Sequence, residues 1–290
     1  MDYLFLAGSV ACASTSSIFG GYFNRACEGK KDSSSYYNLF QLLTVFLGWT
    51  LLFALNADFN IAVLPYAIGF GIAYCVSTFG IINALRTGPV LITTLIQQFS
   101  LIAVTVWGFF FWNASITPIV VIGLILVMIA IFLCLYKGKS ASATEEKFSF
   151  KWLVYVAMAF VGNAGCTIIQ RTQQMAFDGR YGNMLMMIAT FFGLIFFLVK
   201  FLMSDRSDAR FVLKRCPFPI ATGVCNLILN LFVMLLATST LSPSLIYPSI
   251  SIGGLIIVTL FSLFAFREKL RASQWVGVGL GIISVLLLSL

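Results

Sequence analysis

Histidine is absent from this chain, and charged residues are scarce. Of the 290 residues only 10% are charged and 60% are hydrophobic, whereas an ordinary soluble domain carries about 25% charged residues. A water-soluble protein of this length has too much surface to cover with so few charges, so the composition indicates a lipid bilayer. The net charge of +8 would suggest nucleic acid in a soluble protein. Here the basic residues lie in short connectors between apolar runs, and we expect no nucleic-acid partner.

Groups that hold metals or perform catalysis are also missing. None of the seven cysteines forms a C-x-x-C pair and most lie inside apolar runs, so we expect no metal, cofactor or disulfide framework. The ten acidic residues are Asp2, Glu28, Asp32, Asp58, Glu145, Glu146, Asp178, Asp205, Asp208 and Glu268. All of them fall in connectors or at the ends of apolar runs. An enzyme embedded in the membrane needs acids, histidines or an activated nucleophile there, so we expect no enzymatic activity.

Long hydrophobic runs make up most of the sequence. A helix needs about 20 apolar residues to cross a hydrocarbon core of about 30 Å. Ten segments qualify, at about 3–25, 36–56, 61–85, 89–112, 117–136, 152–174, 183–203, 217–238, 243–266 and 273–290. Strands of a membrane barrel would alternate apolar and polar residues, whereas these runs are apolar at consecutive positions. The sequence therefore predicts an all-α integral membrane protein with ten transmembrane helices.

The two halves of the chain repeat each other. Pro89-Val90-Leu91-Ile92-Thr93 resembles Pro243-Ser244-Leu245-Ile246-Tyr247, 154 residues further on, and Gly123 and Gly277 have the same separation. Asn38 and Gly48 match Asn183 and Gly193 at a separation of 145 residues. Prolines and glycines paired at one spacing are a stronger signal than apolar identities, which arise easily by chance.

Each repeat contains five helices, which determines how the halves are related. We expect a first repeat at 1–137, a linker at 138–151 and a second repeat at 152–290. Because five is an odd number, the second repeat enters the membrane from the opposite side. Such inverted-topology repeats are common in transporters, with the substrate site near the midplane where the halves meet.

The basic residues lie on one side of the predicted membrane. Sixteen of the 18 Lys and Arg residues fall in odd-numbered connectors, and the even-numbered connectors carry only Arg171 and Arg180. The positive-inside rule then places the odd-numbered connectors in the cytoplasm and both termini outside. We expect the plasma membrane as the location.

The end of the second repeat carries a recognisable motif. Pro243 opens the ninth segment, Phe266-Arg267-Glu268-Lys269-Leu270 closes it, and Gln274 and Gly277 open the tenth. This pattern resembles the ten-helix EamA-type members of the drug/metabolite transporter superfamily. The first half matches in part, through Gly88-Pro89 and Gly123, and departs at Ala114, where Glu268 would map. The resemblance implies an exporter, importer or exchanger of small metabolites. For Glu268 itself, a role in fastening the helix end competes with a role in transport.

Neutral polar side chains inside the apolar segments are the candidate binding residues. They are Thr93 and Gln97, Tyr247 and Ser251, Asn163 and Gln170, Asn226 and Asn230, Gln41 and Ser14. The spacing of four or seven residues places each of the first four pairs on one helix face, and Gln41 and Ser14, on two other segments, are expected to add to the wall of the site. We expect the pairs of segments four and nine to face each other and to bind an uncharged or zwitterionic small molecule, such as an amino-acid-like solute. The alternative interpretation is hydrogen bonding between helices, which polar side chains in membranes commonly provide.

Two further residues leave alternatives open. Arg171, next to Gln170, either holds a substrate carboxylate or snorkels to the membrane interface. Pro248 lies inside the ninth segment, where it should kink the helix and free a backbone carbonyl.

The function expected from these features is solute transport by alternating access. Because no acid or histidine lies at membrane depth, we expect a uniporter or exchanger without proton coupling through an acid in the pathway. A membrane receptor or scaffold without transport activity is the alternative, and the sequence leaves the oligomeric state open.

Overall fold

The computed structural model of the protein describes residues 1–27, 30, 32–87, 90–114, 116–135, 149–203, 208–265 and 272–288. The ten long helices in this part of the chain are α1 (Asp2–Ala26), α2 (Ser33–Leu55), α3 (Leu64–Thr87), α4 (Val90–Phe111), α5 (Pro118–Leu135), α6 (Phe150–Ala176), α7 (Gly182–Leu202), α9 (Pro217–Ala237), α10 (Pro243–Ala265) and α11 (Ala272–Leu288). A 3-10 helix, η1 (Ile61–Val63), precedes α3, and the short α8 (Ala209–Leu213) precedes α9. Each of the ten predicted segments is therefore a helix, and the bounds agree to within three residues.

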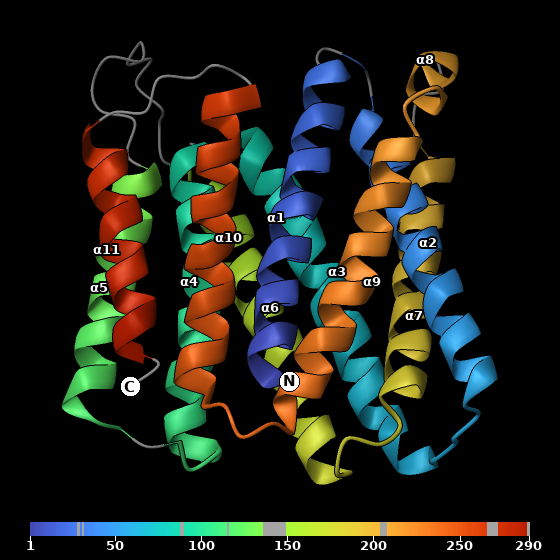
Figure 1. The fold of residues 1–290 in the computed structure, drawn as a ribbon. Helices are drawn as coiled ribbons and strands as arrows, with labels where there is room; N and C mark the ends of the chain where they lie inside the picture. Colours follow the sequence, from blue (N-terminus) through green and yellow to red (C-terminus); the bar gives the residue numbers. More distant parts are fainter. Residues whose placement is uncertain are drawn as a thin grey trace. The chain divides into compact units, whose positions relative to one another are not determined.

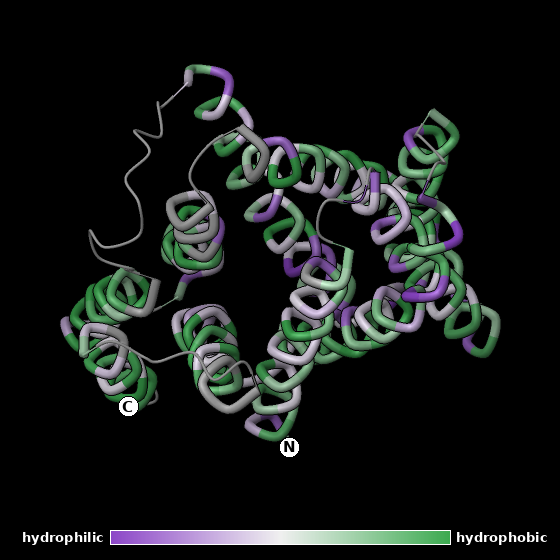
Figure 2. The backbone as a smooth tube through the Cα atoms, turned by 90° about the horizontal axis from the view of Figure 1, so that it is seen from above, coloured by the Kyte–Doolittle hydropathy of each residue, from purple (hydrophilic) through white to green (hydrophobic). Residues whose placement is uncertain are grey.

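The described chain is that of an α-helical membrane protein. Seven helices are long and apolar enough to cross a membrane, at Asp2–Asn24, Ser33–Leu55, Ile61–Ala84, Phe150–Ala176, Gly182–Leu202, Pro217–Ala237 and Pro243–Phe261. Three shorter apolar helices are described at Phe99–Phe111, Pro118–Leu133 and Trp275–Leu288. Figure 2 shows that hydrophobic residues predominate along the helices. Residues 138–148 of the predicted linker lie outside the described residues, and so does the segment Phe266–Leu270 of the Glu268 motif.

The helices form two structural units that do not coincide with the two sequence halves. Apart from the first two residues, unit 1 comprises Tyr3–Cys75 and Ile169–Ser239, and unit 2 comprises Val76–Ile168 and Thr240–Leu290. Each unit thus takes helices from both halves. The division falls inside α3 and α6, so each of these helices contributes one part to each unit (Figure 1).

Unit 1 is built around α2, which packs against α7 and α9. The helices α2 and α7 run antiparallel, because Asn183 at the start of α7 donates a hydrogen bond to the Leu52 carbonyl near the end of α2, at 3.2 Å. Ten residues further along α7, Gly193 faces Leu42, which is ten residues before Leu52 on α2. The buried faces of α2 carry large apolar side chains, and Trp49 and Tyr36 are almost completely buried.

Unit 2 packs α5 against α11 and α4 against α10. Gly123, near the start of α5, meets Leu288 at the end of α11, so these helices are antiparallel. The helices α4 and α10 are antiparallel as well, because Thr105 of α4 donates to the carbonyl of Pro243, the first residue of α10, at 3.4 Å.

Candidate functional site

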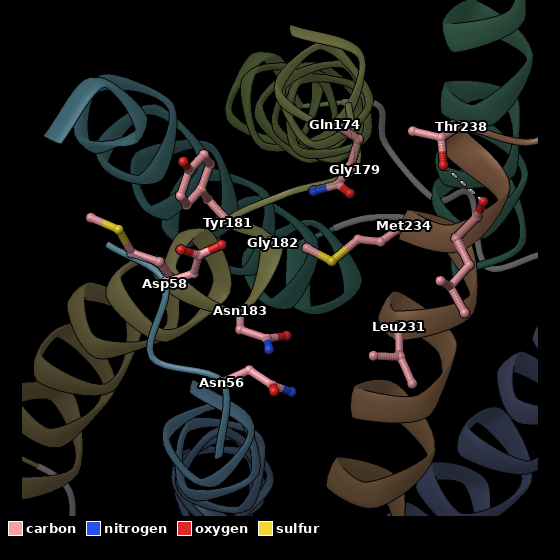
Figure 3. Close-up of a pocket in the computed structure, with 12 residues that line it drawn as sticks. Asn56, Asp58, Gln174, Gly179, Tyr181, Gly182, Asn183, Leu231, Met234 and Thr238 are labelled. Atoms are coloured by element: carbon pink, nitrogen blue, oxygen red, sulfur yellow. Dashed lines mark hydrogen bonds between the residues drawn. The ribbon is translucent and has the colours of Figure 1, made fainter. Parts of the chain in front are cut away.

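A pocket of about 250 Å³ lies at one end of unit 1 (Figure 3). It is formed where α2, α6 and α9 end and α7 begins. Its polar lining comes from Asn56, Asp58, Gln174, Tyr181, Asn183 and Thr238, and its apolar lining from Met184, Leu231, Met234 and Leu235. Connectors rather than helix interiors supply Asn56, Asp58, Tyr181 and Thr238, so the pocket opens at the end of the helices.

The turn between α6 and α7 forms one wall of this pocket. Asp178, Gly179 and Tyr181 have positive φ angles of 49°, 78° and 62°, in the left-handed region that glycine adopts without steric cost. The N–H of Gly179 donates to the Gln174 carbonyl at 2.8 Å, which closes the end of α6. The Gln173 side chain then donates to the Arg180 carbonyl at 2.9 Å. These bonds fasten the turn, and Tyr181 and Gly182 line the pocket as a result.

An ion pair joins the two connectors at the mouth of the pocket. A guanidinium nitrogen of Arg180 lies 3.1 Å from a carboxylate oxygen of Asp58. The side chains are 63% and 53% exposed, respectively. The hydrogen bond to Asp58 raises the pKa of the Arg180 guanidinium above its ordinary value. Because Arg180 balances the charge of Asp58, the polar lining of the pocket is neutral as a whole.

Amide side chains continue from the pocket toward the interior of unit 1. Gln170 lies one turn deeper than Gln174 on α6, and Asn230 lies one turn deeper than Met234 on α9. The Gln170 amide donates to the side-chain oxygen of Asn230 at 3.4 Å, and Asn230 donates to the side-chain oxygen of Asn226 at 3.1 Å. We call Gln170, Asn230 and Asn226 the amide ladder.

The other two candidates of unit 1 lie at or below this ladder. Ser14 on α1 is buried and donates to the Val10 carbonyl of its own helix at 2.6 Å. The Phe19–Phe218 and Phe5–Phe232 ring contacts set the register of α1 against α9, and Ser14 is then level with Gly223, about one turn below Asn226. Gln41 lies about one turn below Asn226, because its carbonyl oxygen faces Gly223 of α9, at 2.7 Å from the position of an added Cβ.

The five candidates of unit 2 are arranged differently. Thr93 accepts a hydrogen bond from the Trp152 indole at 3.0 Å. Asn163 donates to the Ser100 hydroxyl at 2.6 Å. Gln97, one turn from Thr93, is half-buried, and its carbonyl accepts from Ser100 at 2.6 Å.

The structure does not place Thr93 of α4 opposite its repeat equivalent Tyr247 of α10. Tyr247 of α10 packs near Trp112, just beyond the end of α4, with ring centroids 6.4 Å apart. Thr93 is near the start of α4, 15 residues or about 22 Å from Gly108, which faces Pro243. Thr93 and Tyr247 are therefore separated along the axis of the α4–α10 pair, whereas the contact of Thr105 with Pro243 places the buried Ser251, eight residues into α10, about level with Gln97.

Some residues at the pocket were not among the sequence candidates. Gln173 and Gln174 are buried, with 0% and 2% exposure, and Arg171 is only 6% exposed. The burial of Arg171 favours an inward-facing guanidinium over a side chain that extends away from the protein to the membrane interface. The signal for these residues is the polar run Gln170-Arg171-Thr172-Gln173-Gln174 at the end of an apolar helix.

The arrangement suits the binding of a small polar molecule. Within the described ranges, no group of three or more His, Cys, Asp or Glu side chains is placed to hold a metal ion. The polar side chains of the pocket and the amide ladder are neutral amides and hydroxyls together with one paired carboxylate, that of Asp58. Such groups can donate and accept hydrogen bonds to a small polar molecule.

Comparisons with known proteins identify the fold but no family. No model of a protein family matches the sequence, and no curated protein matches it. The chain is similar to a solved structure described as "Crystal structure of protein", with a TM-score of 0.71 and 11% identity over 99% of this chain and 95% of that chain. At this level of identity, the chain shares with that protein a fold, and nothing further follows about activity.

Proposed function

We propose that the protein is a transporter of small polar metabolites that works by alternating access. The observation that carries this proposal is the pocket of unit 1, whose polar lining continues inward as the amide ladder. Polar side chains whose only role is to form hydrogen bonds between neighbouring helices do not require a cavity at the end of the series. An amide series that begins at a pocket and extends between apolar helices is the arrangement that a solute pathway requires.

The packing of equivalent helices supports an inverted repeat of ten membrane-spanning helices. The repeats pair the second predicted helix with the seventh, the fourth with the ninth and the fifth with the tenth. In the structure these pairs are α2 with α7, α4 with α10 and α5 with α11, and each pair packs antiparallel. A two-fold axis in the membrane plane reverses helix direction, so it predicts antiparallel packing of helices that meet across it. This agrees with the ten-helix EamA-type transporters of the drug/metabolite transporter superfamily, to which we assign the protein.

The charge pattern supports an outward location of the pocket. Its connector residues belong to the second, sixth and eighth connectors, which carry few basic residues, and these are Asn56, Asp58, Gly179, Tyr181 and Thr238. The positive-inside rule assigns these connectors to the outer side. We infer that the pocket is the outer entrance of a plasma-membrane carrier with both termini outside.

The site chemistry restricts the solute. The pocket volume of about 250 Å³ is below the range of about 300–1,000 Å³ typical for drug-sized ligands. The neutral lining favours an uncharged or zwitterionic solute over a cationic drug, because a desolvated cation needs an anionic partner. The absence of acids from the apolar segments of the sequence favours uniport or exchange over proton coupling.

Solute counterflow in proteoliposomes tests this proposal. Pooled amino acids, nucleosides and sugars are offered with and without a pH gradient. We expect accumulation of one compound class, independent of the gradient, and its loss in Asn230→Leu, which interrupts the amide ladder. The control is Ser9→Ala, because Ser9 is buried but donates only to the Phe5 carbonyl of its own helix in the described structure, at 2.8 Å. Folded protein that moves none of these compounds would contradict transport and favour a receptor or scaffold.

A further inference from the structure

The short helix α8 lies between the ends of two membrane-spanning helices of unit 1 (Figure 1). The span of α7 ends at Leu202, and the span of α9 begins at Pro217. Because α8 occupies Ala209–Leu213, only a few residues separate it from either span. The helix therefore lies at the surface of the membrane, at the level of the lipid headgroups. The connector that contains it, residues 203–216, has four basic and two acidic residues in the sequence.

The inner side of α8 is fixed to the rest of unit 1. Val212 is 0% exposed and belongs to an apolar cluster with Phe23, near the end of α1, and Tyr36, near the start of α2. Lys30, in the connector between α1 and α2, forms an ion pair with Asp208 at 3.1 Å. These contacts hold α8 against the start of α2, so the fold determines which side chains of α8 face outward.

The outer side of α8 combines positive charge with exposed apolar side chains. Arg210 and Lys214 are exposed and four residues apart, so they share one face. Neither forms an ion pair with a carboxylate among the described residues. Phe211 and Leu213 are 36% and 47% exposed. Cations beside large exposed apolar groups are typical of helices in the membrane interface, where the apolar groups contact acyl chains and the cations remain at the headgroups.

Two further cations are held in place by the ring of Phe211. The Arg215 guanidinium lies over this ring, 3.7 Å from its centroid, and donates to the Phe211 carbonyl at 3.2 Å. The Lys30 ammonium lies 4.9 Å from the same centroid. A guanidinium stacked on an aromatic ring loses little freedom on binding, and its N–H groups match the oxygens of a phosphate. Phe211 therefore positions two cations at the segment that also carries Arg210 and Lys214.

We propose that the outer surface of α8, formed by Arg210, Phe211, Leu213, Lys214 and Arg215, binds the headgroup of an anionic phospholipid. The guanidinium and ammonium groups donate hydrogen bonds to the phosphate oxygens, and Phe211 and Leu213 contact the acyl chains. Anionic lipids give the cytoplasmic leaflet its negative surface potential, and the positive-inside rule assigns the connector of α8 to that side. The inference does not depend on transport, because a receptor or scaffold would bind lipid in the same way.

Lipids that differ only in the headgroup test this inference. The purified full chain in a neutral detergent is titrated with dioleoyl phosphatidylglycerol or dioleoyl phosphatidylcholine, with bound lipid measured by native mass spectrometry and stability by the Tm. We expect phosphatidylglycerol to bind more tightly and to raise the Tm more, because a ligand of the folded state stabilises that state. Added salt should reduce this preference by screening exposed charges. Equal binding of both lipids would overturn the assignment, since cations that only orient the chain during insertion need no headgroup preference.

Variants of the two exposed cations locate the site. Arg210→Gln and Lys214→Gln should each weaken phosphatidylglycerol binding about fivefold, and the double variant about 25-fold, as expected for single charges at a membrane surface. Arg210→Lys keeps the charge and should lose less than Arg210→Gln. The control is Lys151→Gln, which removes an exposed lysine at the start of α6 on the same predicted side of the membrane. An unchanged headgroup preference in the double variant, or an equal loss in the control, would overturn the role of α8.

Inorganic phosphate distinguishes a lipid site from a site for a free anion. We expect phosphate to change the Tm of the wild-type protein and of the double variant alike, relative to chloride at equal ionic strength, because it has no acyl chains to contact Phe211 and Leu213. A stabilisation by phosphate that the double variant loses would overturn the assignment to a lipid headgroup in favour of a free anion.

Discussion

The two structural units use the same kinds of polar residue in different ways. In unit 2, short hydrogen bonds join polar groups of neighbouring helices, such as Trp152 with Thr93 at 3.0 Å and Asn163 with Ser100 at 2.6 Å. In unit 1, amides of α6 and α9 are joined by longer bonds of 3.4 Å and lead to a pocket. Polar residues at helical spacing therefore serve as structural contacts in one unit and as the lining of a candidate pathway in the other.

The helix α3 shows the same contrast along a single element. A Cβ at Gly80, in unit 2, would lie 2.6 Å from the Ala159 nitrogen and 2.7 Å from the Tyr155 carbonyl oxygen. A Cβ at Gly69, in unit 1, would meet only the end of the Ile169 side chain, at 3.4 Å. The backbones at Gly80 approach too closely to accept even a methyl group, whereas the contact at Gly69 has room for one.

The largest expected effect comes from this pair of glycines. Gly80→Ala should lower the free energy of unfolding by about 2 kcal/mol, because backbone atoms cannot move aside for the added methyl group. Gly69→Ala should leave stability unchanged or raise it slightly, since alanine is the better helix former. Unfolding of both variants in a denaturing detergent titration gives the comparison. Equal effects would mean that the two units are packed alike.

Substitution of two tryptophans, one in each unit, tests the same comparison with an expected effect about half as large. Trp152→Phe and Trp49→Phe remove similar ring volume, but only Trp152 donates to a described acceptor, Thr93. We therefore expect Trp152→Phe to cost about 1 kcal/mol more than Trp49→Phe, the typical net value of a buried hydrogen bond. Thermal unfolding of the two purified variants measures the difference. A larger loss in Trp49→Phe would show that its indole nitrogen has an acceptor after all.

Two asparagines separate structural from binding roles. Asn163→Leu should lower stability by about 0.6 kcal/mol, the average for a hydrogen bond between membrane helices, and leave the solute-induced shift in Tm unchanged. Asn230→Leu should abolish that shift while lowering the Tm of the unbound protein by a comparable amount, because it too loses one bond between helices. The same thermal assay with and without solute reads both effects. The reverse pattern would move the binding site from unit 1 to unit 2.

The smallest effect is expected at Ser249, a polar residue of unit 2 that does not follow the hydrogen-bonding pattern of that unit. Ser249 is buried and its hydroxyl has no hydrogen-bond partner among the described residues. Ser249→Ala should therefore raise stability by about 0.5 kcal/mol, because it removes a desolvated polar group. Ser100→Ala, which loses a bond from Asn163, should lower it. A destabilised Ser249→Ala protein would indicate that this hydroxyl binds water or solute.

The helices could be predicted because the bilayer requires long apolar runs and the connectors interrupt them. The bounds of the helices follow from this contrast in polarity, because the polarity of each residue is known from its identity alone. The short α8 and η1 were missed, since helices of five and three residues leave no periodic signal. The ten-helix count was expected from hydropathy alone, and seven of the described helices have the full length and apolarity of a membrane span.

The site was predicted less well because it depends on which helix ends meet. Thr93 and Tyr247 are equivalent in the repeat, but both lie near the start of their helices. Antiparallel packing of α4 and α10 then separates them along the helix axis, and it brings Gln97 about level with Ser251 instead. The sequence paired Asn226 with Asn230, which are hydrogen-bonded in the structure, and Asn163 with Gln170, which bond to different partners. The binding role of all four stays a prediction. The pocket was missed because Asp58 and Tyr181 lie in connectors, where polar residues usually face water.

The division of α3 and α6 between two units affects the order in which the chain can be assembled during synthesis. Unit 1 needs Tyr3–Cys75 and also Ile169–Ser239, so its first helices wait for almost a hundred intervening residues before their partners emerge. At a translation rate of about 5–20 residues per second, this delay lasts about 5–20 seconds. Unit 2 has a shorter gap between its two parts, but it is completed later because it needs α10 and α11. The N-terminal helices are therefore inserted first but remain incompletely packed, and a nascent chain that stops at the central linker has completed neither unit.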